Sequence, residues 1–163
     1  MVNEPNPNKK LIENFYSSFA RRDFAGMSDC YGPNVEFSDP VFSLQGKEAR
    51  AMWHMLCESG KDLTITFKDV EANERTGKAQ WEATYTFSST GRKVHNILDA
   101  DFQFEDGKIS RHRDRFNFWR WARQALGPAG ILLGWTPMIH NRVRQTAGHN
   151  LAKFIARHPE YQQ

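Results

Sequence analysis

The spacing of apolar residues changes from a helical to a strand period near Asp62, and this change constrains the fold more than any other feature of the sequence. Before it, apolar residues mostly recur at intervals of three and four, as on one face of a helix. After it, they recur at intervals of two, as on one face of a strand. Helices followed by a run of strands indicate an α+β fold in which the helices gather on one face of a sheet.

Three helices are expected before the long strand pattern starts. The first begins at Pro7, a residue suited to the first helical turn, and keeps a helical stripe through Phe19. The second is capped by Asp23 and extends to Tyr31. The third occupies residues 47–59, where apolar side chains again recur at helical spacing.

The second half of the pattern predicts a meander of antiparallel strands. The expected strands span residues 63–72, 79–87, 94–104 and 109–118. The phase of the first strand slips near Lys68 and Asp69, which predicts a β-bulge. Asp106 and Gly107 predict a tight hairpin between the last two strands.

The composition excludes membrane-spanning and disordered classes. Hydrophobic residues make up 39% of the chain and charged residues 25%, as in a soluble globular protein. The longest apolar stretch, Ala129–Trp135, is far shorter than the roughly 20 residues of a membrane span. Cys30 and Cys57 fall in expected helices, which favours packed thiols over a disulfide framework. Without a secretory signal pattern, the expected location is cytoplasmic.

Basic residues are concentrated in the C-terminal third of the chain. Residues 111–163 carry 9 Lys and Arg against 2 Asp and Glu, whereas residues 1–110 carry 13 against 17. An apolar stripe with basic residues on the opposite face predicts an amphipathic helix over residues 139–155. We therefore expect a domain of residues 1–126 and a C-terminal helical extension of residues 127–163 that packs on it.

Asp39 interrupts the apolar side of a strand expected at residues 35–40. Val35 and Phe37 lie on that side, and Asp39 continues it. Pro40 holds Asp39 in an extended conformation. A carboxylate directed at an apolar interior has a raised pKa, which suits a general base. The alternative is that Asp39 caps the turn at Pro40 by accepting backbone hydrogen bonds.

The last strand is predicted to direct a second carboxylate at the interior. His112, Asp114 and Phe116 share one face of this strand, and the three arginines of residues 111–115 share the other. A row of arginines favours the solvent or an interface, so His112 and Asp114 are expected to lie on the covered face with the aromatic side chains. A buried imidazole and carboxylate fit either a catalytic pair or a satisfied structural pair.

Five short motifs lie in the first two thirds of the chain. They are Arg22–Gly26, Val35–Val41, Gly91–Lys93, Phe102–Phe104 and Gly107–Lys108. With the order of helices and strands, they resemble the nuclear transport factor 2-like (NTF2-like) superfamily, and within it the SnoaL-like polyketide cyclase and ketosteroid isomerase branch. The resemblance implies a cone, in which a curved antiparallel sheet packs on three N-terminal helices around an apolar pocket open at one end.

The resemblance also implies a role for Asp39, which falls where ketosteroid isomerases carry the aspartate that moves the substrate proton. In those enzymes a tyrosine and a protonated aspartate stabilise the developing oxyanion. The matching residues here are Phe15 and Ala100, which donate no side-chain hydrogen bond. Since losing one such donor costs about 10²–10³ in rate, steroid isomerisation by that mechanism is not expected.

Two other branches of the superfamily offer comparisons. SnoaL-like cyclases are more similar, since they use a strand aspartate as acid/base for an aldol closure. Epoxide hydrolases of this fold use an Asp–Arg–Asp set around a water. That set fits less well, because the arginines on either side of Asp114 are predicted to face away from it.

The sequence therefore predicts cofactor-free proton transfer next to a carbonyl, as in an isomerisation or an aldol-type cyclisation. The expected catalytic residues are Asp39, His112 and Asp114, without a metal. The expected ligand is apolar and flat or polycyclic. Its expected contacts are Phe15, Phe37, Trp53, His54, Trp81, Tyr85, Phe116 and Phe118. The alternative is a non-catalytic small-molecule-binding or scaffold protein of the same fold.

The charged outer face and the extension suggest further partners. A homodimer is expected across the outer face of the sheet, where the arginines of residues 111–115 can meet His95, Asp99 and Asp101. No nucleic-acid partner is expected. The extension is expected to cover the mouth of the cone or the sheet edge, and the alternative is contact with a membrane surface through the C-terminal helix.

Overall fold

The computed structural model describes residues 4–162. Residues 1–3 of the expected domain and residue 163 of the expected extension lie outside the described residues. The helices are α1 (Pro7–Ala20), α2 (Phe24–Asp29), α3 (Lys47–Ser59), α4 (Phe118–Leu126), α5 (Pro128–Leu133), α6 (Pro137–Ala156) and the short 3-10 helix η1 (Pro159–Tyr161). The strands are β1 (Tyr31–Ser38), β2 (Ser43–Gln45), β3 (Thr64–Ala72), β4 (Thr76–Phe87), β5 (Arg92–Glu105) and β6 (Lys108–Arg115).

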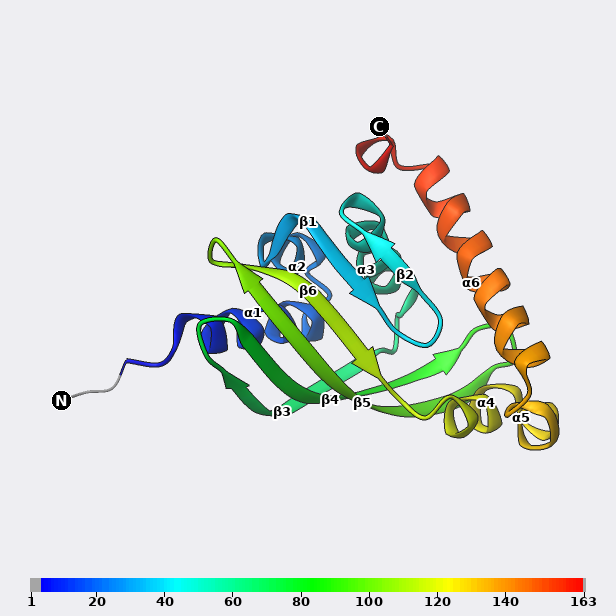
Figure 1. Ribbon diagram of the computed structural model, residues 1–163. Helices are drawn as coiled ribbons and strands as arrows, with labels where there is room; N and C mark the ends of the chain where they lie inside the picture. The colour runs from blue at the N-terminus through cyan, green and yellow to red at the C-terminus, as the bar shows by residue number, and fades with distance from the viewer. Residues whose placement is uncertain (1–3, 163) are drawn as a thin grey trace.

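One six-stranded curved sheet, in the order β2-β1-β6-β5-β4-β3, forms the body of the molecule. Helices α1, α2 and α3 lie against one of its faces (Figure 1). The expected α+β architecture is confirmed. The predicted antiparallel meander is confirmed in β3 to β6, and β1 pairs antiparallel with β2 but parallel with β6. A parallel pair needs a long crossover, and here α3 and strands β2 to β5 lie between the two partners in sequence.

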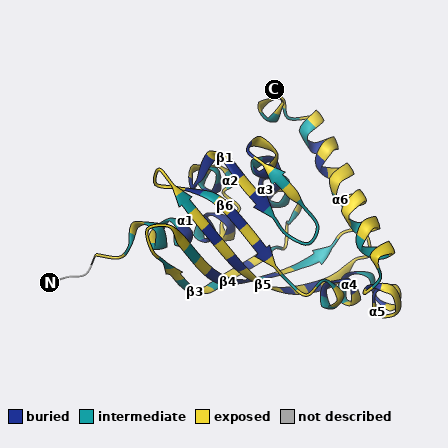
Figure 2. Ribbon diagram, viewed as in Figure 1, coloured by how far each residue is buried: buried dark blue, intermediate teal, exposed yellow. Residues whose placement is uncertain are grey.

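The predicted alternation of β5 and β6 is confirmed. Buried and exposed residues alternate along both strands, which Figure 2 shows as alternating dark blue and yellow bands. On β6, His112 and Asp114 are buried, and the three arginines of residues 111–115 are exposed. The parity of this strand therefore sends one imidazole and one carboxylate into the core.

The predicted bulge and hairpin are also confirmed. The pairing of β3 with β4 shifts register between Lys68 and Glu71, and Asp69 has a φ of 56°. At the β5–β6 turn, Asp106 and Gly107 have φ angles of 53° and 75°. Two successive residues in the left-handed region are typical of the type I′ turn that matches the twist of a hairpin.

One predicted boundary is wrong at the start of β1. The sequence places Tyr31 on the second helix, but α2 ends at Asp29 and Tyr31 is the first residue of β1. Tyr31 pairs with Ile109 of β6, whose backbone N–H also donates to the carbonyl of Cys30. Pairing with β6 thus outweighs the helical spacing of the apolar residues in this segment.

A second predicted boundary is wrong at the end of β6. The strand stops at Arg115, and Phe118 already starts α4. The side chain of Asn117 accepts a hydrogen bond from the backbone N–H of Arg120, which caps the new helix. The aromatic side chains that follow Arg115 therefore belong to a loop and a helix rather than to the strand.

The outer face of the sheet carries the expected charged neighbours. Asp101 forms an ion pair with Arg115 of the adjacent strand at 2.9 Å, and Glu36 pairs with Arg111 at 2.8 Å. These pairs are exposed, so each contributes at most about 1 kcal/mol. The homodimer across this face stays a prediction.

The C-terminal segment packs back onto the cone. Helix α6 runs from the α4–α5 end of the molecule towards α3 (Figure 1), and its Leu151 and Phe154 are buried in the main core. Near its other end, His140 Nε2 and Arg144 Nε lie 2.7 and 2.9 Å from the carbonyl oxygen of Pro40. Among the described residues, no helix is both long and apolar enough to cross a bilayer.

Candidate functional site

The centre of the cone is filled with aromatic side chains. Phe15, Phe37, Trp53 and Trp81 are almost fully buried, and the other three rings each lie within 6.3 Å of the Trp53 ring, centroid to centroid. His112 stacks on Trp53 with ring centroids 5.9 Å apart. Four of the expected ligand contacts are therefore packed against protein in this structure.

A chain of hydrogen bonds runs through this aromatic core. The hydroxyl of Tyr31 lies 2.8 Å from His112 Nδ1, and His112 Nε2 lies 2.9 Å from Asp114 Oδ1. Trp53 Nε1 donates to the Tyr31 hydroxyl at 2.9 Å, and Trp81 Nε1 donates to Asp114 Oδ1 at 3.2 Å. All five side chains are buried, so every bond is shielded from water.

The donors at the two ends set the direction of this chain. Because Trp53 donates to the Tyr31 oxygen, the Tyr31 O–H is free to donate to His112 Nδ1. His112 then carries its proton on Nε2 and donates to Asp114. Burial, with a further contribution from the Asp114 carboxylate, raises the pKa of Tyr31 well above its usual range and keeps its hydroxyl a donor.

Tyr31 is the member of this site that the sequence analysis missed. The apolar spacing of residues 24–31 assigned it to a helix face, where it had no relation to His112. The available signal was Pro33, because a proline disfavours helical backbone in the residue before it. A strand start at residue 31 would have directed the hydroxyl into the sheet interior.

Asp39 lies just beyond the end of β1, next to Pro40. Its Oδ1 accepts hydrogen bonds from the backbone N–H groups of Val41 at 2.7 Å and Phe42 at 2.6 Å, so the turn-capping alternative is present. Burial nevertheless raises the pKa of Asp39 to about 6; the two backbone hydrogen bonds oppose this rise, and the Asp114 carboxylate adds to it. The capping role and a raised pKa therefore coexist in one carboxylate.

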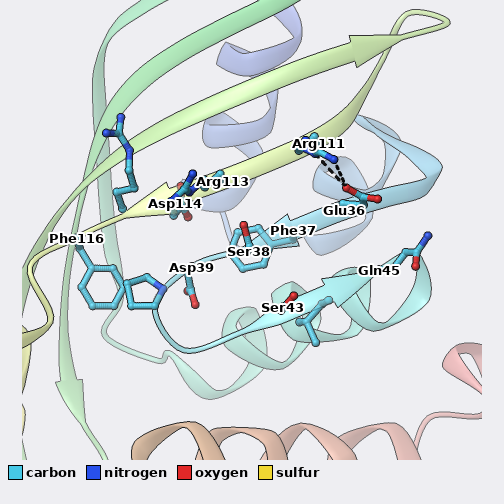
Figure 3. Close-up of a pocket in the computed structure, with 13 residues that line it drawn as sticks. Glu36, Phe37, Ser38, Asp39, Ser43, Gln45, Arg111, Arg113, Asp114 and Phe116 are labelled. Carbon is cyan, nitrogen blue, oxygen red and sulfur yellow. Dashed lines mark hydrogen bonds and ion pairs between the residues drawn. The ribbon is translucent and has the colours of Figure 1, made fainter. Parts of the chain in front are cut away.

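A pocket of about 730 Å³ lies over β1, β2 and the end of β6. Figure 3 shows Asp39 and Phe116 at one end of this pocket and the Arg111–Glu36 pair at the other. Asp114 is also part of its lining, beside the exposed arginines of β6. Both carboxyls therefore lie along this pocket, but the Asp114 side chain is only 1% exposed and points into the core, on the face opposite to the arginines.

Of the other predicted ligand contacts, Tyr85 and Phe118 lie beside α4 and His54 lies beside the C-terminal segment. Tyr85 accepts a hydrogen bond from Trp121 Nε1 at 2.8 Å, and Phe118 stacks on His140 of α6 with centroids 4.1 Å apart. His54 belongs to a separate cluster, where its Nδ1 lies 2.8 Å from the hydroxyl of Tyr161. The structure does not bring His54 together with the buried hydrogen-bond chain.

The two buried tyrosines of the core give a matched test of this chain. Tyr31→Phe leaves Trp53 Nε1 and His112 Nδ1 without a partner, so we expect the free energy of unfolding to fall by about 2–4 kcal/mol. Within residues 4–162 the buried Tyr16 hydroxyl has no hydrogen-bond partner, so Tyr16→Phe should be neutral or stabilise by about 1 kcal/mol. Urea denaturation measures both variants, and equal losses would contradict the assigned hydrogen bonds.

The raised pKa of Asp39 predicts a pH-dependent stability difference. The unfolded chain releases this proton near pH 3.8 and the folded chain near pH 6, so this carboxyl lowers the stability of the fold as pH rises through that window. Asp39→Asn keeps the hydrogen-bond acceptor but cannot ionise. Its free energy of unfolding minus that of the wild type should grow by up to about 3 kcal/mol across the window. Denaturation series at several pH values measure this difference, and a constant one would contradict the shift.

A model of the SnoaL-like domain matches residues 12–112. A candidate SnoaL-like polyketide cyclase from Jannaschia sp. CCS1 superposes with a TM-score of 0.67 at 13% identity, covering 78% of this chain and 99% of that one. No curated protein matches the chain.

Two further solved structures have the same fold. A candidate polyketide cyclase from Xanthomonas campestris pv. campestris has a TM-score of 0.61 and 19% identity, covering 72% of this chain and 96% of that one. An LEH-like epoxide hydrolase from M. tuberculosis has a TM-score of 0.62 and 14% identity, with coverages of 77% and 92%. Since the family match spans more than half of the chain and these structures share its architecture, this protein belongs to the SnoaL-like domain family, with an NTF2-like fold.

Proposed function

We propose that this protein is an acid–base enzyme that moves a proton at a carbon next to a carbonyl of a small apolar substrate. The observation that carries the proposal is Asp39, a carboxylate in a pocket wall whose pKa is raised to about 6. A general base is most effective when its pKa lies near the working pH. Asp39 also keeps one oxygen for a substrate, because the backbone hydrogen bonds occupy only Oδ1.

The reaction begins when Asp39 removes the α-proton and the C–H electron pair becomes an enolate. Asp39 then returns the proton to another carbon in an isomerisation. In an aldol closure the enolate carbon attacks a second carbonyl, and the proton goes to the new alkoxide. Cyclisation and isomerisation are also the reactions named for two solved structures of this fold, a candidate polyketide cyclase and a candidate ketosteroid isomerase. Those names support the class of reaction and leave the substrate open.

Tyr85 is the group we assign to the developing oxyanion. Its hydroxyl oxygen accepts a hydrogen bond from Trp121, which leaves its own proton free for a substrate oxygen. Burial raises the pKa of Tyr85; the hydrogen bond from Trp121 opposes this rise and the negative charge of Asp39 adds to it, so the hydroxyl stays protonated. Tyr85 would supply a donor that Phe15 and Ala100 lack.

His112 and Asp114 then act as positioning residues. His112 is fully buried and both of its ring nitrogens have protein partners, so it has no free nitrogen for a substrate. It holds Asp114 in place, and the Asp114 charge raises the pKa of Asp39. Tyr31→Phe removes a hydrogen bond that holds His112 beside Asp114, so it should shift the pH profile of Asp39 as well as lower the stability.

A panel of apolar carbonyl compounds with acidic α-protons tests the proposal. Exchange of the α-proton with deuterated water, followed by NMR, detects proton transfer without knowledge of the product. For the wild type the rate should rise with pH and level off above about 6, as Asp39 ionises. Asp39→Asn should lower it by about 10²–10⁴-fold and Tyr85→Phe by about 10²–10³-fold.

Tyr16→Phe is the matched control for Tyr85→Phe, because its buried hydroxyl has no hydrogen-bond partner within residues 4–162. Its exchange rate should equal that of the wild type. The pocket beside β1 and β2 favours a second candidate function, a small-molecule-binding protein without turnover. That alternative holds if ligands bind equally to the wild type and Asp39→Asn while neither exchanges the proton.

A further inference from the structure

Three potential metal ligands meet where the C-terminal segment packs on α3. One nitrogen or oxygen atom from each of His54, Glu58 and His158 lies within 4.8 Å of the other two. His54 Nε2 and Glu58 Oε1 are 2.8 Å apart, on adjacent turns of the same helix face. Two imidazoles and a carboxylate are a ligand set that zinc commonly takes, with water in the fourth position.

Both imidazoles already have the outer partners that metal-binding histidines usually have. His158 Nδ1 lies 2.7 Å from the carbonyl oxygen of Phe154 and donates to it, which leaves Nε2 unprotonated. His54 Nδ1 lies 2.8 Å from the Tyr161 hydroxyl, so its Nε2 is the nitrogen on the Glu58 side. Such hydrogen bonds fix the ring and its tautomer in known metal sites.

The surroundings of the cluster also suit a bound ion. Phe24 stacks on His54 with centroids 3.5 Å apart, and Phe154 stacks on His158 at 3.8 Å. These rings form an apolar shell that holds both imidazoles in place. Glu58 is half exposed and leaves a route to solvent for the metal.

From this geometry we infer that His54, Glu58 and His158 bind a divalent transition metal, with zinc as the best fit. The ion joins the end of α3 to the segment after α6 and so fastens the C-terminal extension to the cone. This inference uses none of the residues proposed for catalysis.

Zinc titration of the untagged protein, by calorimetry at neutral pH, tests the site. We expect one zinc per chain at micromolar concentration and a rise in Tm on binding. Glu58→Gln and His158→Gln should abolish saturable binding, and Tyr161→Phe should weaken it by about 10–100-fold, as expected for a partner of a metal ligand. Cobalt in place of zinc should give the visible absorption of a tetrahedral site.

The chain offers a matched control in another histidine–glutamate pair. His95 Nε2 and Glu82 Oε1 are 2.7 Å apart on the sheet surface, but no third ligand joins them among the described residues. His95→Gln should bind zinc like the wild type. Undiminished binding by His158→Gln, with its fold checked by circular dichroism, would overturn the site, as would a wild type that does not bind.

A second inference comes from the exposed end of the extension. We name this surface the apolar tip: it consists of Trp119, Ile131, Leu132, Leu133, Trp135 and Met138, all of them exposed. Leu132 and Trp135 are 70% and 72% exposed. Trp119 Nε1 donates to the carbonyl oxygen of Ile131 and so links α4 to α5. Figure 2 shows exposed residues over α5 and along α6. Contiguous apolar surface of this kind marks an interaction site.

The charge around the apolar tip favours an anionic lipid surface as its partner. Residues 116–145, which include the apolar tip, contain four Arg and no Asp, Glu or Lys. The guanidinium of Arg123 lies 4.8 Å from the Trp119 ring centre, and Arg142 is exposed on α6. Two copies meeting at this surface would bring like charges together, whereas anionic headgroups would neutralise them. We propose that the apolar tip docks on an anionic membrane surface, with Trp119 and Trp135 at the headgroup level.

Vesicle sedimentation tests this docking. The wild type should bind vesicles containing phosphatidylglycerol, bind phosphatidylcholine vesicles at least tenfold more weakly, and lose affinity as salt increases. The double variant Leu132→Glu, Trp135→Glu should lose binding, and Ile97→Glu, on the exposed outer face of β5, should keep it. Equal binding to both lipids would overturn the proposal. So would light scattering that shows a wild-type dimer and a monomeric double variant, which would assign the apolar tip to a second copy.

Discussion

The buried contact between His112 and Asp114 is the interaction on which the rest of the core depends. A carboxylate and an imidazole removed from water cost several kcal/mol unless their hydrogen bonds are satisfied. Here the direct partners are Tyr31 of β1 and Trp81 of β4, and Trp53 of α3 donates in turn to the Tyr31 hydroxyl. The pair therefore fixes the position of α3 against the sheet more specifically than apolar packing alone, because each polar atom has one geometry that satisfies it.

The same contact sets the register of β6 and, through it, the place of Asp39. A slip of one residue along β6 would turn its three arginines into the aromatic core, so only the observed register buries His112 and Asp114 and leaves the arginines exposed. In that register Phe37 pairs with His112 in parallel, and β1 ends at Ser38, which pairs with Arg113, the residue before Asp114. Asp39 follows at the strand end, where the negative charge of Asp114 adds to the effect of burial on its pKa.

How far the sequence could predict this site depends on the range of each interaction. The inward faces of His112 and Asp114, and the position of Asp39 on the apolar side of its strand, follow from strand parity and were predictable. The place of Tyr31 was not, because local helical spacing competed with pairing to a strand almost eighty residues away. The dense packing of the core also escaped prediction: composition counts the aromatic side chains but does not tell whether they line a cavity or fill it.

The C-terminal extension explains how a carboxylate at the end of a strand can be so poorly solvated. His140 and Arg144 of α6 both lie within hydrogen-bond distance of the carbonyl of Pro40, the residue directly after Asp39. The helix therefore covers the turn that holds Asp39, and it carries three of the nine basic residues of the C-terminal third. Its far end is anchored on α3 through Phe154 and the His54 cluster. Any motion that frees this end of α6 would expose the turn to water and lower the pKa of Asp39, so the anchoring of the extension and the basicity of the proposed catalytic carboxylate are coupled.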